Sequence, residues 1–105
     1  MRSRYAAYAA GLSDYIIATT DPGGPMWQLD KAEWRSEITA FSGLTQFQGV
    51  LIVDHGADGD EGFVAFRAQL TQGGRDASFE ERSRFTRVDG RWLYHSGVHP
   101  DQGGG

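Results

Sequence analysis

The sequence predicts an α+β fold in which N-terminal helices pack on an antiparallel sheet of about four strands. Apolar residues in the first part of the chain recur at steps of three and four, which is typical of amphipathic helices. After Gly43 the apolar spacing changes to a period of two, and glycine-containing pairs typical of turns divide the rest of the chain. Helices followed by a strand meander are typical of domains whose helices cover one face of the sheet.

The first helical stripe spans residues 5–16. We predict one helix to about Ala10 and a second that starts at Ser13, whose side chain would cap it. The second helix should end before Asp21, because a residue that precedes proline disfavours the helical conformation. The opening of the chain therefore predicts two short helices.

A further helical stripe follows the turn-rich segment 21–25. Asp30 and Glu33 form an acidic version of the capping box, which marks a helix N-terminus. The apolar stripe behind this cap predicts a helix from Lys31 to about Phe41.

The rest of the chain is typical of four strands joined by tight turns. We place the strands near residues 45–55, 62–71, 77–88 and 91–97. The pairs between them are Asp58-Gly59, Gly73-Gly74 and Asp89-Gly90. Asp-Gly is favoured in hairpins whose two turn residues both need a positive φ. We expect residues 1–100 to form a single domain and 101–105 to be a disordered glycine-rich tail.

The composition excludes several kinds of site. The sequence has no cysteine, so disulfides, thiolate zinc sites, iron–sulfur clusters and cysteine nucleophiles are excluded. Its three histidines are dispersed, and we expect neither a metal nor another cofactor. The net charge of −4 argues against binding to membranes or non-specific binding to nucleic acids. The default location for such a chain is the cytoplasm of a bacterium.

Strand parity raises a question about the charged segment 79–94. Counting by two, Glu81 shares a face with the phenylalanines of its strand, whereas Arg82 and Arg84 lie on the other face. The phenylalanines indicate the buried face, so Glu81 points inward and needs a partner there. Arg4 or Arg2 of the first helix is the expected partner, which would make Glu81 half of a structural ion pair.

Three stretches of the sequence, MRSRYAAYAAGLSDYIIATTDP, EGFVAFRAQL and ERSRFTRVDGRWLYHSG, resemble the YchJ family of bacterial proteins of unknown function. The resemblance implies a nuclear-transport-factor-2-like fold, in which helices close a strongly curved sheet into a cone with an internal pocket. Family members usually carry a cysteine-rich SEC-C zinc motif, which has no counterpart in this cysteine-free sequence. The resemblance therefore implies an architecture and no activity.

Three interpretations of function remain open. In the first, the domain binds a small ligand in its pocket, or a protein partner, without catalysis. The pocket candidates are Arg4, Tyr5, Tyr8, Trp34, Phe66, Glu81, Ser83, Phe85, Trp92 and Tyr94. In the second, the domain is an enzyme with Glu81 as general base. In the third, Arg82, Arg84 and Arg87 contact an anion or a nucleic acid.

Two further expectations concern the oligomeric state and His55. Arginines on the outer face of the sheet, among them Arg67, disfavour a tight apolar interface, so we expect a monomer or a weak homodimer. His55 follows Asp54, but neighbours on a strand point to opposite faces, so the two should not form a catalytic dyad. We expect His55 to lie at the edge of a loop.

Overall fold

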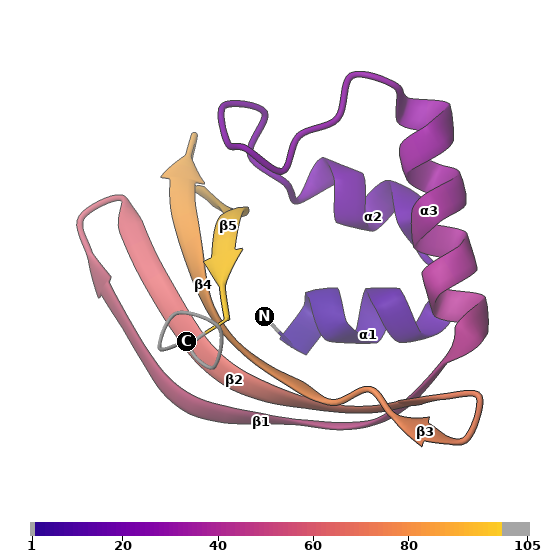
Figure 1. Cartoon of the computed structure of the whole chain (residues 1–105). Helices are drawn as coiled ribbons and strands as arrows, with labels where there is room; N and C mark the ends of the chain where they lie inside the picture. Colours follow the sequence, from indigo (N-terminus) through magenta and orange to yellow (C-terminus); the bar gives the residue numbers. More distant parts are fainter. Residues whose placement is uncertain (1, 100–105) are drawn as a thin grey trace.

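The computed structural model describes residues 2–99, with only the backbone of Arg2, and shows an α+β fold of three helices followed by an antiparallel sheet (Figure 1). The helices are α1 (Arg2–Ala10), α2 (Ser13–Ala18) and α3 (Lys31–Leu44). The strands are β1 (Thr45–Asp58), β2 (Glu61–Gln72), β3 (Arg75–Asp76), β4 (Phe79–Val88) and β5 (Arg91–Val98). The predicted fold class and the order of its elements are confirmed, while the expected tail, 101–105, lies outside the described residues.

The junction of α1 and α2 differs from the prediction in its cap. Gly11 has a φ of 70°, and the backbone N–H of Leu12 donates to the carbonyl of Ala7 at 2.8 Å, which ends α1 in a tight turn. Leu12 then occupies the N-cap of α2, and no side chain caps this end. The predicted cap by Ser13 is wrong, because Ser13 already lies inside the helix.

The start of α3 agrees with the prediction and its end does not. The Asp30 side chain accepts a hydrogen bond from the backbone N–H of Glu33 at 3.0 Å, as a capping box requires. The helix continues beyond the predicted end at Phe41 to Leu44 and passes directly into β1 at Thr45. The change from helix to strand thus needs no loop.

The strands form one antiparallel sheet in the order β1-β2-β4-β5, and the two-residue β3 pairs with β2 alone. Two residues are too few to show a period, so β3 was missed and the strand predicted at 77–88 begins at Phe79. Register shifts interrupt β1 after Phe47 and Ile52 and β4 after Arg84. Such bulges increase bending and twist, and Figure 1 shows a strongly curved sheet with the helices inside its curve.

Two of the three hairpin turns have the predicted backbone. Gly73-Gly74 and Asp89-Gly90 have positive φ at both residues. In the first hairpin Asp58 instead pairs with Glu61, so the turn residues are Gly59 and Asp60, of which only Gly59 has a positive φ. The predicted Asp58-Gly59 turn is therefore displaced by one residue.

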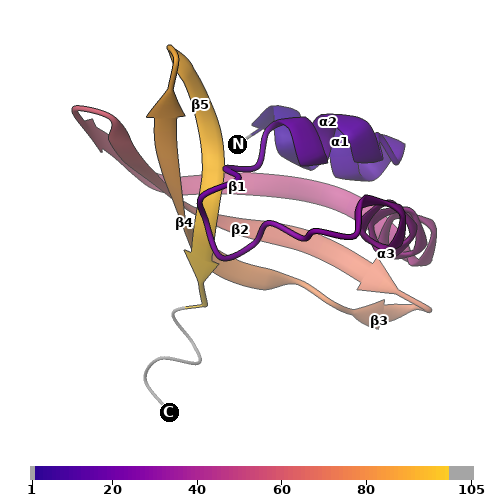
Figure 2. The ribbon, with the colours of Figure 1, turned by 90° about the horizontal axis from the view of Figure 1, so that it is seen from above.

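The segment after α2 completes the fold by pairing with the edge strand β5. The N–H of Asp21 donates to the Tyr94 carbonyl at 2.8 Å, and the Tyr94 N–H donates to the Thr19 carbonyl at 2.7 Å. Thr20 thereby forms a parallel bridge with Tyr94. Figure 2 shows this segment running beside β5 on its way to α3. The bridge holds Tyr94 between the segment after α2 and its partner Phe85 on β4.

Candidate functional site

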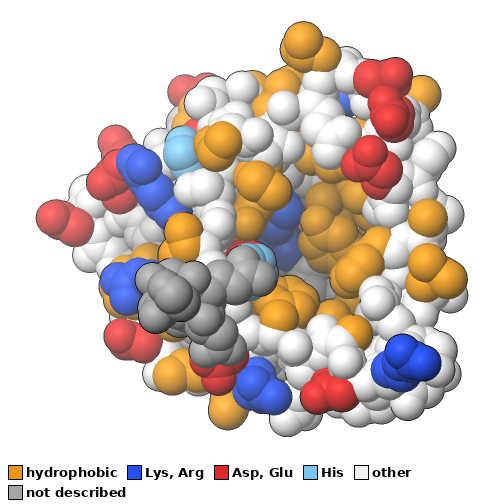
Figure 3. All heavy atoms as spheres, in the orientation of Figure 1, with side chains coloured by type: hydrophobic (Ala, Val, Ile, Leu, Met, Phe, Trp, Pro, Cys, Tyr) orange, Lys and Arg blue, Asp and Glu red, His pale blue; other side chains and the backbone are white. Residues whose placement is uncertain are grey.

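The concave side of the sheet holds a cavity of about 490 Å³, called the inner cavity below. Figure 3 shows a hollow in this face surrounded by hydrophobic side chains. Seven of the ten predicted pocket residues line the inner cavity: Arg4, Tyr5, Tyr8, Trp34, Phe66, Glu81 and Tyr94. Three aromatic residues of the wall, Phe41, Phe47 and Phe79, were not predicted as pocket residues. That the cavity holds a ligand stays a prediction.

Glu81 points inward from β4, as strand parity predicted. On the same face Ser83 is fully buried and Phe85 is buried, whereas Arg82 and Arg84 on the other face are exposed. Oε2 of Glu81 accepts hydrogen bonds from the Ser83 hydroxyl at 2.5 Å and from the Tyr94 hydroxyl at 3.2 Å. Its second oxygen, Oε1, has no hydrogen-bond donor among residues 3–99 or the backbone of Arg2. One carboxylate oxygen in the cavity wall is therefore free to accept from a ligand.

The predicted ion pair between Glu81 and Arg4 is wrong. Nη1 of Arg4 donates to the Thr19 hydroxyl at 2.7 Å and to the Ile16 carbonyl at 3.2 Å. The Arg4 guanidinium lies 4.5 Å from the centre of the Tyr94 ring, whose hydroxyl faces Glu81. Tyr94 thus lies between the two charges. Carbonyls at the end of α2 attract a cation, which explains why Arg4 turns toward them. The side chain of Arg2, the other predicted partner, lies outside the described part of the chain.

Burial changes the ionisation of three side chains around the inner cavity. It lowers the pKa of Arg4, which is 7% exposed, while the charges of Tyr8 and Tyr94 in their ionised forms, and then that of Glu81, act in the opposite direction. Burial raises the pKa of Tyr8. Burial, and after it the charge of Glu81, raises the pKa of Tyr94 far above its usual range. Both phenols are therefore neutral hydrogen-bond donors at physiological pH.

The Tyr5 hydroxyl is a further polar group at the inner cavity. It is buried and has no hydrogen-bond partner among residues 2–99. The ring of Tyr5 packs edge-on against Phe47 with 5.5 Å between the ring centres. This packing of the ring fixes the position of the hydroxyl. A buried hydroxyl without a partner is costly, and a ligand atom or a water molecule would satisfy it.

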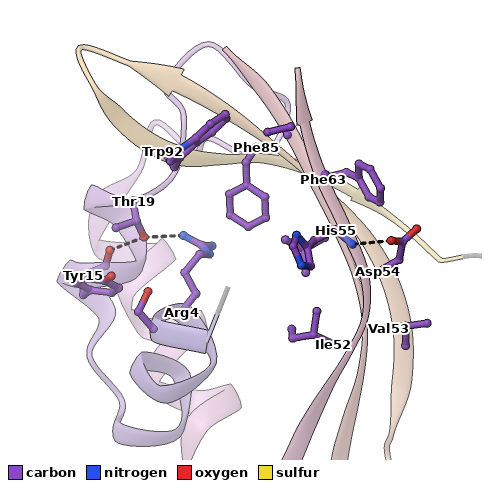
Figure 4. A pocket seen from close by; sticks show the side chains of 15 residues that line it. Arg4, Tyr15, Thr19, Ile52, Val53, Asp54, His55, Phe63, Phe85 and Trp92 are labelled. Carbon is purple, nitrogen blue, oxygen red and sulfur yellow. Dashed lines mark hydrogen bonds between the residues drawn. The ribbon is translucent and has the colours of Figure 1, made fainter. Parts of the chain in front are cut away.

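A second, more open cavity of about 940 Å³, called the outer cavity below, lies between the first two helices and the far half of β1 (Figure 4). The predicted pocket residues Phe85 and Trp92 line this cavity and not the inner one, while Arg4 lines both. Ser83 lines neither, because it is fully buried beneath Glu81. The ten predicted pocket residues are therefore divided between two cavities and the core.

His55 lies inside β1 and not at the edge of a loop, which corrects the prediction. Figure 4 shows its side chain on the same side of β1 as Arg4 and that of Asp54 on the opposite side. The Asp54 carboxylate accepts the backbone N–H of His55 at 2.9 Å. The side chains of the two residues therefore do not form a dyad, as strand parity predicted.

Three of the four arginines of the charged segment, Arg82, Arg84 and Arg87, are engaged on the sheet surface. Arg84 pairs with Glu61, Arg87 pairs with Asp60 at 3.1 Å, and the Arg82 guanidinium lies 4.0 Å from the centre of the Phe63 ring. Exposed pairs of this kind contribute little to stability. Because two of these three cations already have carboxylate partners, they offer little free positive charge to an anion.

Two kinds of feature are absent from the part of the chain that the structure describes. Within residues 2–99, no three His, Asp or Glu side chains gather in an arrangement that could hold a metal ion. No helix in the same range is long and apolar enough to cross a membrane.

Comparison with known proteins assigns the chain to a family. A family model described as the YchJ middle NTF2-like domain matches residues 1–97. A UPF0225 protein of Serratia proteamaculans is 38% identical over 107 residues, which cover 98% of this chain and 66% of that protein. The chain thus spans slightly less than two thirds of the length of that relative.

Solved structures agree with this assignment. The solution structure of a SEC-C motif containing protein from Rhodopseudomonas palustris is 34% identical with a TM-score of 0.80, over 94% of this chain and 74% of that one. A SEC-C motif containing protein from Psychrobacter arcticus is 21% identical with a TM-score of 0.70, over 91% and 56%, and shares the fold. The chain belongs to the YchJ family, whose middle NTF2-like domain it contains.

Proposed function

We propose that this domain binds a small molecule in the inner cavity, with an apolar or aromatic body and one group that donates a hydrogen bond to Glu81. The observation that carries the proposal is the free Oε1 atom of Glu81 in a largely aromatic wall. Ligand pockets commonly combine an apolar lining with a few fixed polar groups. The Ser83 and Tyr94 hydroxyls fix Oε2 and so hold Oε1 in one orientation.

A primary amine or a hydroxyl group suits this arrangement. A carboxylate accepts from either, and the hydrogen bond from an ammonium group is the stronger of the two because it is charge-assisted. The aromatic side chains Phe66 and Trp34 would contact the body of the ligand. The enzyme interpretation would use the same Oε1 atom as a general base, and it needs a substrate that the cavity first binds.

The proposal is tested with phenethylamine and phenethyl alcohol as probes. They share an aromatic body and differ in the donor group. We expect the indole signal of Trp34 in an NMR spectrum to shift with both probes, and the amine to bind about tenfold more tightly. Glu81→Gln, which keeps the shape of the side chain and removes its charge, should abolish this preference.

Glu80→Gln is the matched control. Glu80 precedes Glu81 on β4, points to the other face and pairs with Arg67 at 3.5 Å. This variant should bind both probes like the wild type. The proposal would be contradicted if neither probe shifts the Trp34 signal. It would also be contradicted if Glu81→Gln prefers the amine over the alcohol as strongly as the wild type does.

A further inference from the structure

Arg4 is a buried cation without a carboxylate partner among residues 2–99. Ion pairs in this range lie on the surface and are formed by arginines other than Arg4, namely Arg35, Arg67, Arg84 and Arg87. The hydrogen bonds of Arg4 go only to neutral oxygens, and all come from Nη1. A buried charge is normally compensated by an opposite charge in direct contact, whereas Glu81 acts on this guanidinium only across the Tyr94 side chain.

The unused donors of Arg4 belong to a side chain that lines the outer cavity. The guanidinium has five N–H groups, and its hydrogen bonds to Thr19, Thr20 and the Ile16 carbonyl all use Nη1, while the Tyr8 hydroxyl also lies close to it. Figure 4 shows Arg4 pointing from the helices toward the space in front of β1, with Phe85 above this space. A planar anion in the outer cavity could therefore reach the free edge of the guanidinium.

The opposite wall of the outer cavity is compatible with an anion. His55 faces Arg4 across this space and offers a ring nitrogen as a second donor (Figure 4). The acidic residue in this wall, Asp54, points to the other side of β1. Glu81 lines the inner cavity and not the outer one. The side chains that face the outer cavity thus contribute positive charge and no carboxylate.

The remaining walls indicate the kind of anion. Phe85, Trp92 and Tyr15 place aromatic rings around the same space. A guanidinium matches the planar fork of a carboxylate with two parallel hydrogen bonds, and aromatic walls suit a flat apolar body. We propose that the outer cavity is a second binding site, specific for a small aromatic carboxylate held by Arg4 and His55.

The two sites can be told apart by their tryptophans, because Trp92 lines the outer cavity and Trp34 the inner one. The probes are benzoate, benzyl alcohol and inorganic phosphate, each titrated into the full chain to about 10 mM, which nearly saturates a millimolar site. We expect benzoate to shift the Trp92 indole signal and to bind about tenfold more tightly than benzyl alcohol, which lacks the charge. Phosphate should bind more weakly than benzoate, because it gains nothing from the aromatic walls.

The variants assign this binding to the two donors. His55→Ala removes an exposed side chain and should weaken benzoate binding several-fold without unfolding the protein. Arg4→Met should abolish benzoate binding if the variant folds. Arg82→Gln removes a cation on the other face of the sheet and should leave binding unchanged. Three results would overturn the proposal. They are a Trp92 signal that benzoate does not shift, an affinity for benzoate no higher than that for benzyl alcohol or phosphate, and an unchanged affinity for benzoate in His55→Ala.

The outcome is independent of the proposal for the inner cavity. Glu81→Gln should leave benzoate binding unchanged, because Glu81 does not line the outer cavity. A benzoate response at Trp34 instead of Trp92 would place the anion in the inner cavity and contradict the inference. The response of Trp34 to phenethylamine tests the inner cavity separately.

Discussion

Gly97 lies so close to Glu81 that a Cβ atom at position 97 would be 2.5 Å from Cδ of Glu81 and 2.6 Å from the Tyr94 hydroxyl. Real Cβ atoms do not approach other atoms this closely. The glycine on β5 therefore makes room for the hydrogen bond between Tyr94 and Glu81. This relationship connects the sequence of an edge strand to the polar end of the inner cavity.

Gly97→Ala should destabilise the protein by about 1–3 kcal/mol, the usual cost of forcing an extra methyl group into a packed site. The measurement is the free energy of unfolding in urea. Gly43→Ala is the matched control, because nothing lies within 4 Å of a Cβ atom at this position in α3. Since alanine favours a helix over glycine by roughly 0.5–1 kcal/mol, the control should be stabilised. Equal effects of the two substitutions would contradict the steric argument.

Tyr94→Phe should lower the free energy of unfolding by about 1 kcal/mol, because it removes the hydrogen bond to Glu81 and leaves the ring beneath Arg4 in place. In a Glu81→Gln background the same substitution should cost less, since the acceptor has lost its charge. A double-mutant cycle in urea measures this coupling energy, which we expect to be about 0.5–1 kcal/mol. Additive effects of the two substitutions would show that the bond at 3.2 Å contributes nothing to stability.

The sequence predicted what depends on local patterns. The inward position of Glu81 follows from the alternation of side chains along one strand, and the structure confirms it. The cap at Asp30 follows from a spacing of three residues and is also confirmed. The strand alternation and the capping spacing each involve only a few consecutive residues, so they depend little on contacts with distant parts of the chain.

The partner of Glu81 could not be predicted in the same way. Opposite charge selected Arg4, but the guanidinium is held by the end of α2 and by the face of the Tyr94 ring. That position depends on the parallel bridge between Thr20 and Tyr94, which joins residues 74 positions apart and leaves no local pattern. The division of the predicted pocket between two cavities has the same origin, because Arg4, which packs on the Tyr94 ring, lines both cavities.

The pKa of Asp21 is lowered by a hydrogen bond from the Thr86 hydroxyl at 2.6 Å, and next by one from the Gly23 N–H at 2.8 Å. A carboxyl group with a lowered pKa contributes stability above its ordinary value of 3.8, and this contribution is lost as the pH falls through the folded-state pKa. Thr86→Val should therefore lower the free energy of unfolding by about 0.5–1 kcal/mol near pH 7 and by less near pH 2.

The difference between wild type and Thr86→Val is measured by urea unfolding across the acid range. Thr39→Val is the matched control, because Thr39 is exposed on α3 and has no side-chain hydrogen bond among the residues described. Its effect should not change with pH. A constant cost of Thr86→Val from neutral to acid pH would contradict the role of the hydroxyl in holding the ionised Asp21.

The raised pKa of Tyr94 predicts a loss of stability at alkaline pH. Burial is its largest cause, so the folded protein retains the phenolic proton at a pH where the unfolded chain, with an ordinary tyrosine pKa of about 10, has begun to lose it. The contribution of Tyr94 is therefore complete below about pH 10 and decreases as the pH rises above it. Tyr8, whose pKa burial also raises, should act in the same direction. The free energy of unfolding measured from about pH 8 to 11 should fall less steeply in Tyr94→Phe than in the wild type, and equal slopes would contradict the assignment to Tyr94.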